Sequence, residues 1–255
     1  MIGQTEAFLR YKANSQRYLD FVVLVATAVP TLRQTLDAQP ATIATPDYFR
    51  QLGRDSASLR ALIKDYQNQL ASSSVVTLFS YFEEYVRGAL QEIVDFHGGN
   101  QAFLALSKDR SSRFFGPLTP SIRDHKRKLQ EHPKKGKVGK YRKHSSALTH
   151  VGFSFPTDLL APFGASALLG KLDPKRGFKA WEIPDIVEGA LMLGITPKAR
   201  SRLAEIRTLR NTIAHGTVAS VTIKRAMSMG HDLRATAVAI DNHVVEHFLV
   251  LERYA

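Results

Sequence analysis

The segment over residues 75–97 constrains the fold of this chain more than any other. Its apolar side chains recur every three or four positions, which is the spacing of an amphipathic α-helix with one broad buried face. Gly98 and Gly99 follow and predict the end of the helix. We therefore expect a core helix here. Its apolar stripe consists of Val75, Leu78, Phe79, Phe82, Val86, Leu90, Ile93 and Val94.

Helical spacing extends over most of the remaining chain. We expect Pro30 to end the first helix, and Thr45 to cap the second with Pro46 at its first helical position. The serines at 72–74 predict a turn before the core helix. The expected helices cover residues 4–29, 45–70, 75–97, 101–108, 183–193, 197–216 and 220–255, and residues 157–172 are expected to be partly helical.

The sequence predicts an all-α protein. Strand-like alternation of polar and apolar residues does not extend beyond a few positions, and the chain has no internal repeat. With 255 residues, the chain is long enough to bury a sizeable core. We expect one helical domain over residues 1–255, with residues 110–155 forming a basic insertion or mobile loop within it.

Composition limits the classes of site and the location. The chain has no cysteine, which excludes a disulfide framework, a cysteine nucleophile and thiolate metal sites. Its first residues lack the basic and then apolar layout of a signal peptide. The longest early apolar run, residues 21–29, is shorter than the about 20 residues that span a bilayer. We therefore expect a cytoplasmic protein with no membrane partner.

Positive charge is concentrated in one segment. The formal net charge is +12, and residues 123–144 hold ten of the 35 lysines and arginines but two acidic residues. A surface of one sign attracts polyanions, although a charge run is commonly just a solvated loop. We favour RNA as the partner, with Tyr141 stacking on a base. The expected RNA-binding residues are Lys126, Arg127, Lys128, Lys134, Lys135, Lys137, Lys140, Tyr141, Arg142 and Lys143.

A short motif, R-N-x3-H, ends the helix expected over residues 197–216. Arg210 and Asn211 are followed after three residues by His215, and Gly216 closes the segment. The planar guanidinium of arginine binds two phosphate oxygens at once. Histidine transfers protons near neutral pH, and the dipole at a helix C-terminus favours its charged form and an acid role. The motif therefore supplies a phosphate-binding group and a proton-transfer group, both of which cleavage of an RNA strand needs.

Spacing along the helix predicts which of these side chains meet. Asn211 and His215 lie four residues apart and share a face, so we expect Asn211 to orient the imidazole. Arg210 lies five residues from His215, well round the helix, so one chain should bring the two together poorly. Two chains related by a twofold axis would place both pairs around one cleft. The alternative is an ordinary surface arginine and an ordinary histidine at a helix end.

These features resemble the HEPN superfamily, most closely its RiboL-PSP and MAE types. The resemblance covers roughly residues 60–100 and 180–255, and it rests on residues 209–216 and on a Phe-Glu step in the core helix. It implies an up-down helical bundle, here with additional helices and a basic insertion, that pairs into a homodimer. Catalytic members are RNases that need no metal or cofactor and leave a 2′,3′-cyclic phosphate. Many act as toxins or anti-phage defence effectors beside a neutralising partner.

A carboxylate on the core helix is expected to support the motif. Glu83 and Glu84 follow Phe82, and a carboxylate on a packed neighbouring helix would pair with Arg210 and hold its guanidinium in place. Glu83 is preferred because it directly follows Phe82 in the step that resembles the family. The alternative for either residue is a solvated charge on the helix surface.

The sequence thus predicts a dimeric, metal-independent endoribonuclease with Arg210 and His215 as catalytic residues and Asn211 as an orienting residue. The alternative is a catalytically inactive HEPN module that binds RNA or a partner protein, as an antitoxin or a sensor. A zinc site is not expected. His243 and His247 match the pattern H-x-x-E-H, but only eight residues follow His247, and the third ligand of that pattern normally lies well downstream.

Overall fold

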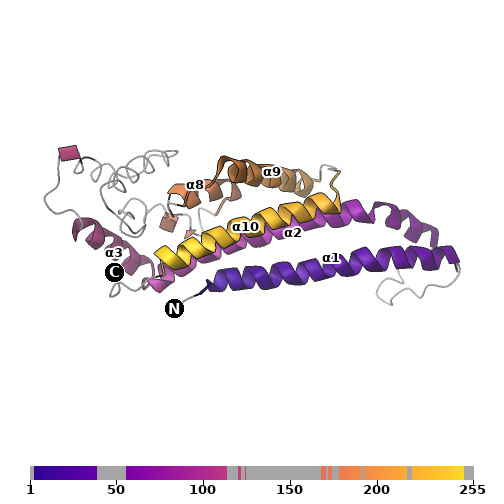
Figure 1. Ribbon diagram of the computed structural model, residues 1–255, viewed down its shortest axis with the longest axis horizontal. Coiled ribbons are helices and arrows are strands. Elements are labelled where there is room, and N and C mark those ends of the chain that lie inside the picture. The colour runs from indigo at the N-terminus through magenta and orange to yellow at the C-terminus, as the bar shows by residue number, and fades with distance from the viewer. Residues whose placement is uncertain are drawn as a thin grey trace.

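The described part of the protein is all-α, as predicted, and contains no strand. Its longest helices are α1 (Glu6–Ala38), α2 (Ser56–Phe96) and α10 (Ile223–His247), and α9 (Pro197–Ala214) packs on α2 and α10 (Figure 1). The computed structural model describes residues 3–38, 56–113, 120–121, 124, 168–170, 172–173, 178–189, 191, 193–216 and 220–249.

The four long helices alternate in direction along the chain, which makes an up-down bundle (Figure 1). α1 and α2 extend past the start of α10 as a two-helix arm. Additional short helices lie toward the opposite end of the bundle: α3 (Asn100–Arg113), the 3-10 helix η2 (Ala180–Glu182) and α8 (Ile183–Gly189). The predicted up-down bundle with additional helices is therefore confirmed.

The core lies along α2, because all eight residues of its predicted apolar stripe are buried. α10 covers this stripe with small and medium-sized side chains, and α9 adds Leu203 and Ile206. Gly98 and Gly99 end α2 with φ angles of 88° and 89°, a backbone conformation that glycine adopts without steric cost. The buried residues of α10 on this side are Ala226, Met229, Leu233, Ala237, Ile240 and Val244.

Two predicted helix breaks are wrong. α1 continues through Pro30 to Ala38, because Pro30 lies on an exposed turn where water can solvate the carbonyl that loses its donor. α2 is continuous through the serines at 72–74. Ser74 is fully buried and its hydroxyl donates to the carbonyl of Leu70 at 2.7 Å, so the serine is satisfied without leaving the helix. The predicted start at Thr45 lies outside the described residues.

The N-terminus of α1 is fastened by carboxylates from two other helices. Asp241 of α10, which is fully buried, accepts hydrogen bonds from the backbone N–H and the hydroxyl of Thr5. Glu92 of α2 accepts from the backbone N–H groups of Glu6 and Ala7, at 3.0 and 2.5 Å. First-turn N–H groups have no partner within their own helix, so these carboxylates satisfy them and complement the helix dipole.

α1 is long and apolar enough to cross a membrane, judged by length and composition alone. Its most apolar window has a mean hydropathy of 1.3, and 11% of that window is buried. The apolar part of the folded helix is therefore longer than the run over residues 21–29 indicates. Core helices of soluble proteins pass the same test but are mostly buried, whereas α1 packs along α2 through one side only, with Ala7, Phe8, Tyr11, Val22 and Leu36 buried. A single helix of this kind does not establish a membrane location.

The remaining helix bounds differ modestly from the expected ones. α8 ends at Gly189, earlier than predicted, and α10 ends at His247 with Phe248 as its C-cap. Within residues 110–155, only 110–113, 120, 121 and 124 belong to the described part of the protein. The basic insertion and the single domain over residues 1–255 therefore stay predictions.

Candidate active site

The local structure of α9 places the predicted motif at a helix end. Thr196 caps the N-terminus by accepting from the backbone N–H of Ala199 at 3.2 Å, and Pro197 begins the helix. His215 is the C-cap, with its N–H donating to the carbonyl of Asn211 at 3.0 Å. Gly216 then takes a φ of 76°, which turns the chain away.

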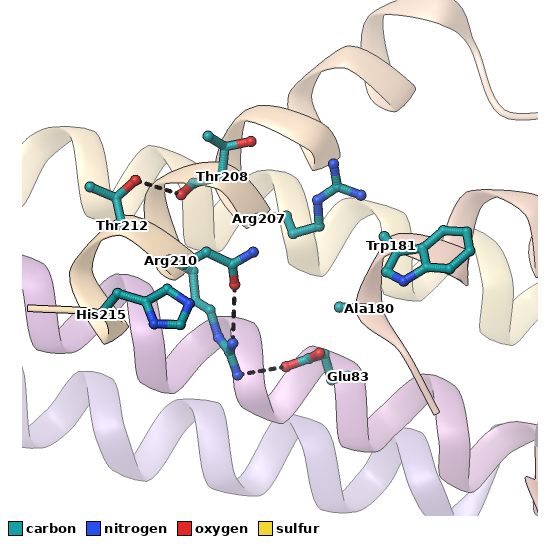
Figure 2. A pocket seen from close by; sticks show the side chains of 9 residues that line it. Glu83, Ala180, Trp181, Arg207, Thr208, Arg210, Thr212 and His215 are labelled. Atoms are coloured by element: carbon teal, nitrogen blue, oxygen red, sulfur yellow. Dashed lines mark hydrogen bonds and ion pairs between the residues drawn. The ribbon is translucent and has the colours of Figure 1, made fainter. Parts of the chain in front are cut away.

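A pocket of about 830 Å³ opens beside this helix end. It brings together all four residues that the sequence singled out for catalysis or support (Figure 2). α9 contributes most of the wall, α2 contributes one carboxylate, and η2 closes the opposite side. The lining residues are Glu83, Ala180, Trp181, Arg207, Thr208, Arg210, Asn211, Thr212 and His215.

Arg210 is held from two sides. One terminal nitrogen donates to Glu83 Oε2 at 3.4 Å and the other donates to Asn211 Oδ1 at 3.1 Å (Figure 2). Its Nε is buried and has no hydrogen-bond partner in the described part of the protein. The guanidinium is therefore oriented by the protein, and each terminal nitrogen keeps a second N–H group for an incoming anion.

Glu83, and not its neighbour, has the position expected for a supporting carboxylate. The side chain of Glu83 is 21% exposed, whereas that of Glu84 is 75% exposed and faces Arg87 at 3.9 Å. Burial raises the pKa of Glu83, and the charge of Arg210 opposes that rise. The cost of burying Glu83 is therefore partly offset by the ion pair that orients Arg210.

Two predicted relationships within the motif differ in the structure. Asn211 Oδ1 accepts from Arg210 and so orients the arginine, in place of the predicted contact with the imidazole. Arg210 and His215 line the same pocket of one chain, although their spacing predicts poor convergence. The reason is reach: Arg210 extends toward α2, where Glu83 holds it, and His215 stands at the point where the helix ends.

A family model described as RiboL-PSP-HEPN matches residues 50–246. The chain belongs to the RiboL-PSP-HEPN family. The match spans α2, α8, α9 and nearly all of α10, and thus every element that lines the pocket. No curated protein and no solved structure shows significant similarity to the chain.

In this RiboL-PSP-HEPN protein, the pocket includes residues that the motif does not name. Arg207 lies four residues before Asn211, on the same face of α9. Trp181 lies in η2 and is the single tryptophan of the chain. The helical spacing of positions 207, 211 and 215 could have revealed Arg207. Nothing local to Trp181 predicts that η2 faces α9.

The predicted basic surface lies outside the described residues of this RiboL-PSP-HEPN protein. It comprises Lys126, Arg127, Lys128, Lys134, Lys135, Lys137, Lys140, Tyr141, Arg142 and Lys143, so the RNA-binding role assigned to them stays a prediction.

The two histidines of the H-x-x-E-H pattern lie on α10 away from the pocket. His243 Nε2 is 2.6 Å from the carbonyl of Leu191, and its ring centroid is 4.5 Å from that of His247. Burial lowers the pKa of His243. Within the described part of the chain, no group of three or more metal-ligating side chains is present. The contact with Leu191 gives His243 a structural role, because it ties the segment after α8 to α10.

Proposed function

We propose that this RiboL-PSP-HEPN protein is a metal-independent endoribonuclease that leaves 2′,3′-cyclic phosphate ends. Membership of the family supports an RNA-related function. One observation carries the finer proposal: an oriented arginine and an exposed histidine line one pocket. Arg210 is fixed by Glu83 and Asn211, and the exposed side chain of His215 has no hydrogen bond or ion pair to any described residue.

These residues match the demands of internal RNA cleavage. The 2′-oxygen attacks the neighbouring phosphorus, a P–O bond to the 2′-oxygen forms and the bond to the 5′-oxygen breaks. The 2′-hydroxyl loses a proton and the departing 5′-oxygen gains one. His215 transfers one of these protons. Arg210 stabilises the charge on the pentacoordinate phosphorus, and Asn211 and Glu83 position Arg210.

Two proton transfers favour a pair of histidines. A homodimer that joined two α9 C-termini across one cleft would supply His215 from each copy, one as base and one as acid. We therefore include the homodimer in the proposal. The need for two proton transfers is the argument for the homodimer. The spacing of Arg210 and His215 is not an argument for it, because one chain already brings both residues to the same pocket.

The cellular role belongs to the same proposal. Metal-independent cleavage of RNA in the cytoplasm halts growth, which suits a toxin or an anti-phage effector held in check by a neutralising partner. Expression of the wild type should then be toxic, and His215→Ala should relieve the toxicity. A chain that was equally toxic with either residue at 215 would contradict this role.

Cleavage of a labelled mixed-sequence RNA in EDTA tests the activity. Wild type should cut, whereas Arg210→Ala and His215→Ala should lose at least about 100-fold in rate. Matched controls are Arg234→Ala and His231→Ala, which remove exposed residues of α10 that do not line the pocket, and both should cut normally. RNA binding without cleavage by the wild type would favour the inactive, RNA-binding alternative. Cutting by all five proteins would place the activity elsewhere.

A further inference from the structure

We propose that Trp181 and Arg207 form a nucleobase-binding subsite that holds the RNA strand next to the Arg210–His215 pocket. This inference rests on the proposed function, since it names where the substrate of that site is held. Its core is one juxtaposition: an exposed indole on η2 stands across the pocket from the cationic face of α9 (Figure 2).

The exposure of Trp181 calls for an explanation. Tryptophan is usually well buried, but Trp181 is 54% exposed. The next residue but one, Ile183, is 2% exposed and packs in the core, so the segment that carries the indole is anchored. The protein thus presents a large flat ring to solvent from a fixed support, which is the arrangement of a stacking platform.

Trp181 stands at the border of two pockets. On one side is the charged pocket of about 830 Å³, and on the other a pocket of about 300 Å³ whose lining is mainly apolar. Arg207 also lines both. A nucleotide likewise combines a flat base, which suits the apolar pocket, with a charged phosphate, which suits the charged one. The apolar part of the smaller pocket includes Phe79, Phe82, Ile183 and Leu203.

Arg207 has the charge that this subsite needs. Within the described part of the chain, no ion pair engages its guanidinium, in contrast to Arg210 on the next turn. It lies between Trp181 and Arg210 around the pocket in Figure 2. A base stacked on Trp181 therefore leaves its phosphate near Arg207, with the strand continuing toward Arg210.

The single tryptophan makes the test direct, because fluorescence excited where tyrosine absorbs little reports Trp181 alone. The probe is a mixed-sequence 2′-O-methyl oligonucleotide, which lacks the attacking hydroxyl and stays intact. It should quench the fluorescence, whereas an abasic phosphodiester of equal length should not. Trp181→Ala should weaken oligonucleotide binding, measured by anisotropy, about 5-fold or more, and Trp181→Phe should retain most of it. Arg207→Ala should weaken binding of both probes.

Phe21→Ala, which removes another exposed aromatic side chain, on α1 and outside both pockets, should leave binding unchanged. Quenching of the His215→Ala variant separates the subsite from catalysis. If wild type cuts no RNA but its fluorescence is quenched, the subsite stands and the ribonuclease proposal fails. If wild type cuts RNA without quenching and Trp181→Ala binds normally, the subsite is wrong. Emission that changes with protein concentration but not with oligonucleotide would assign Trp181 to self-association and would also overturn the subsite.

Discussion

Glu83 Oε2 lies 3.4 Å from a terminal nitrogen of Arg210, which connects the core helix α2 to the pocket face of α9. Glu83 directly follows Phe82, which is fully buried, so the carboxylate is carried by a part of the helix that packing holds still. The position of the Arg210 guanidinium is therefore set by the core as well as by its own helix. This ion pair makes Glu83 a positioning residue.

Glu83→Ala should lower kcat for RNA cleavage by about tenfold while leaving KM less affected. Without its carboxylate partner the guanidinium loses its fixed position, and a tenfold loss of rate corresponds to about 1.4 kcal/mol of transition-state stabilisation. Glu84→Ala is the matched control, since Glu84 is adjacent on the same helix but 75% exposed, and it should cut normally. Equal effects of the two substitutions on kcat would show that Arg210 does not depend on Glu83.

Protonation of Glu83 should set part of the acid limb of the pH–rate profile. Burial raises the pKa of Glu83 above its usual value, so the carboxylate loses its charge at a higher pH than an exposed glutamate. The ion pair with Arg210 is present above that pKa and is lost as the pH falls through it. Glu83→Gln should remove this limb and lower the plateau. A profile whose acid limb is the same in both proteins would contradict the coupling.

The sequence predicts the core and the ends of the helix that carries the motif well, because both are local patterns. The stripe in α2 repeats at helical spacing, and each of its members is buried. Thr196 and Gly216 mark the start and end of α9, because capping chemistry is read within a few residues. A local pattern does not predict the pairing of Glu83 with Arg210. That prediction also used the resemblance of the Phe-Glu step to a known family.

The predicted break at the serines is wrong because packing there overrides local preference. The serines at 72–74 have low helix propensity, but the helix continues because Ser74 is buried and bonded to Leu70. The spacing of Arg210 and His215 shows in which direction each side chain leaves the helix. It does not show how far the long arginine side chain extends, so the shared pocket could not be predicted. Trp181 could not be placed at the site from sequence, since its position depends on how η2 packs against α9.

Ionisation of Asp241 should lower the free energy of unfolding as the pH rises. Burial raises its pKa above the ordinary 3.8 despite the hydrogen bonds from Thr5. The native state then binds more protons than the unfolded state between the two pKa values. The stabilisation that Asp241 provides is complete below about pH 3.8, the ordinary pKa of an aspartate. It decreases as the pH rises from there to the higher pKa that Asp241 has in the native state.

Denaturant unfolding across this pH range should therefore show a pH dependence that Asp241→Asn reduces, because the amide oxygen still accepts from Thr5 but does not ionise. Asp241→Ala should cost about 1–3 kcal/mol at neutral pH, since the Thr5 donors lose their acceptor. An unchanged pH dependence in Asp241→Asn would mean that other carboxylates, such as Glu92, produce it.

Gly88→Ala should destabilise the protein by about 1 kcal/mol, although alanine is the better helix former. A Cβ at this position of α2 would lie 2.9 Å from the Cβ of Ala7, which is fixed to the backbone of α1. Ala7→Gly removes the obstructing methyl. In denaturant unfolding, the double variant should lose less stability than the sum of the two single changes. Additive losses would show that the two helices do not approach this closely.

The chemistry of the new RNA ends tests the central claim most directly. Wild type should cut RNA in EDTA to 2′,3′-cyclic phosphate and 5′-hydroxyl ends, and it should leave the 2′-O-methyl form of the same sequence intact. His215→Ala should produce neither end above background. Ends that carry a 3′-hydroxyl, cleavage of the 2′-O-methyl strand, or full activity of His215→Ala would contradict the account.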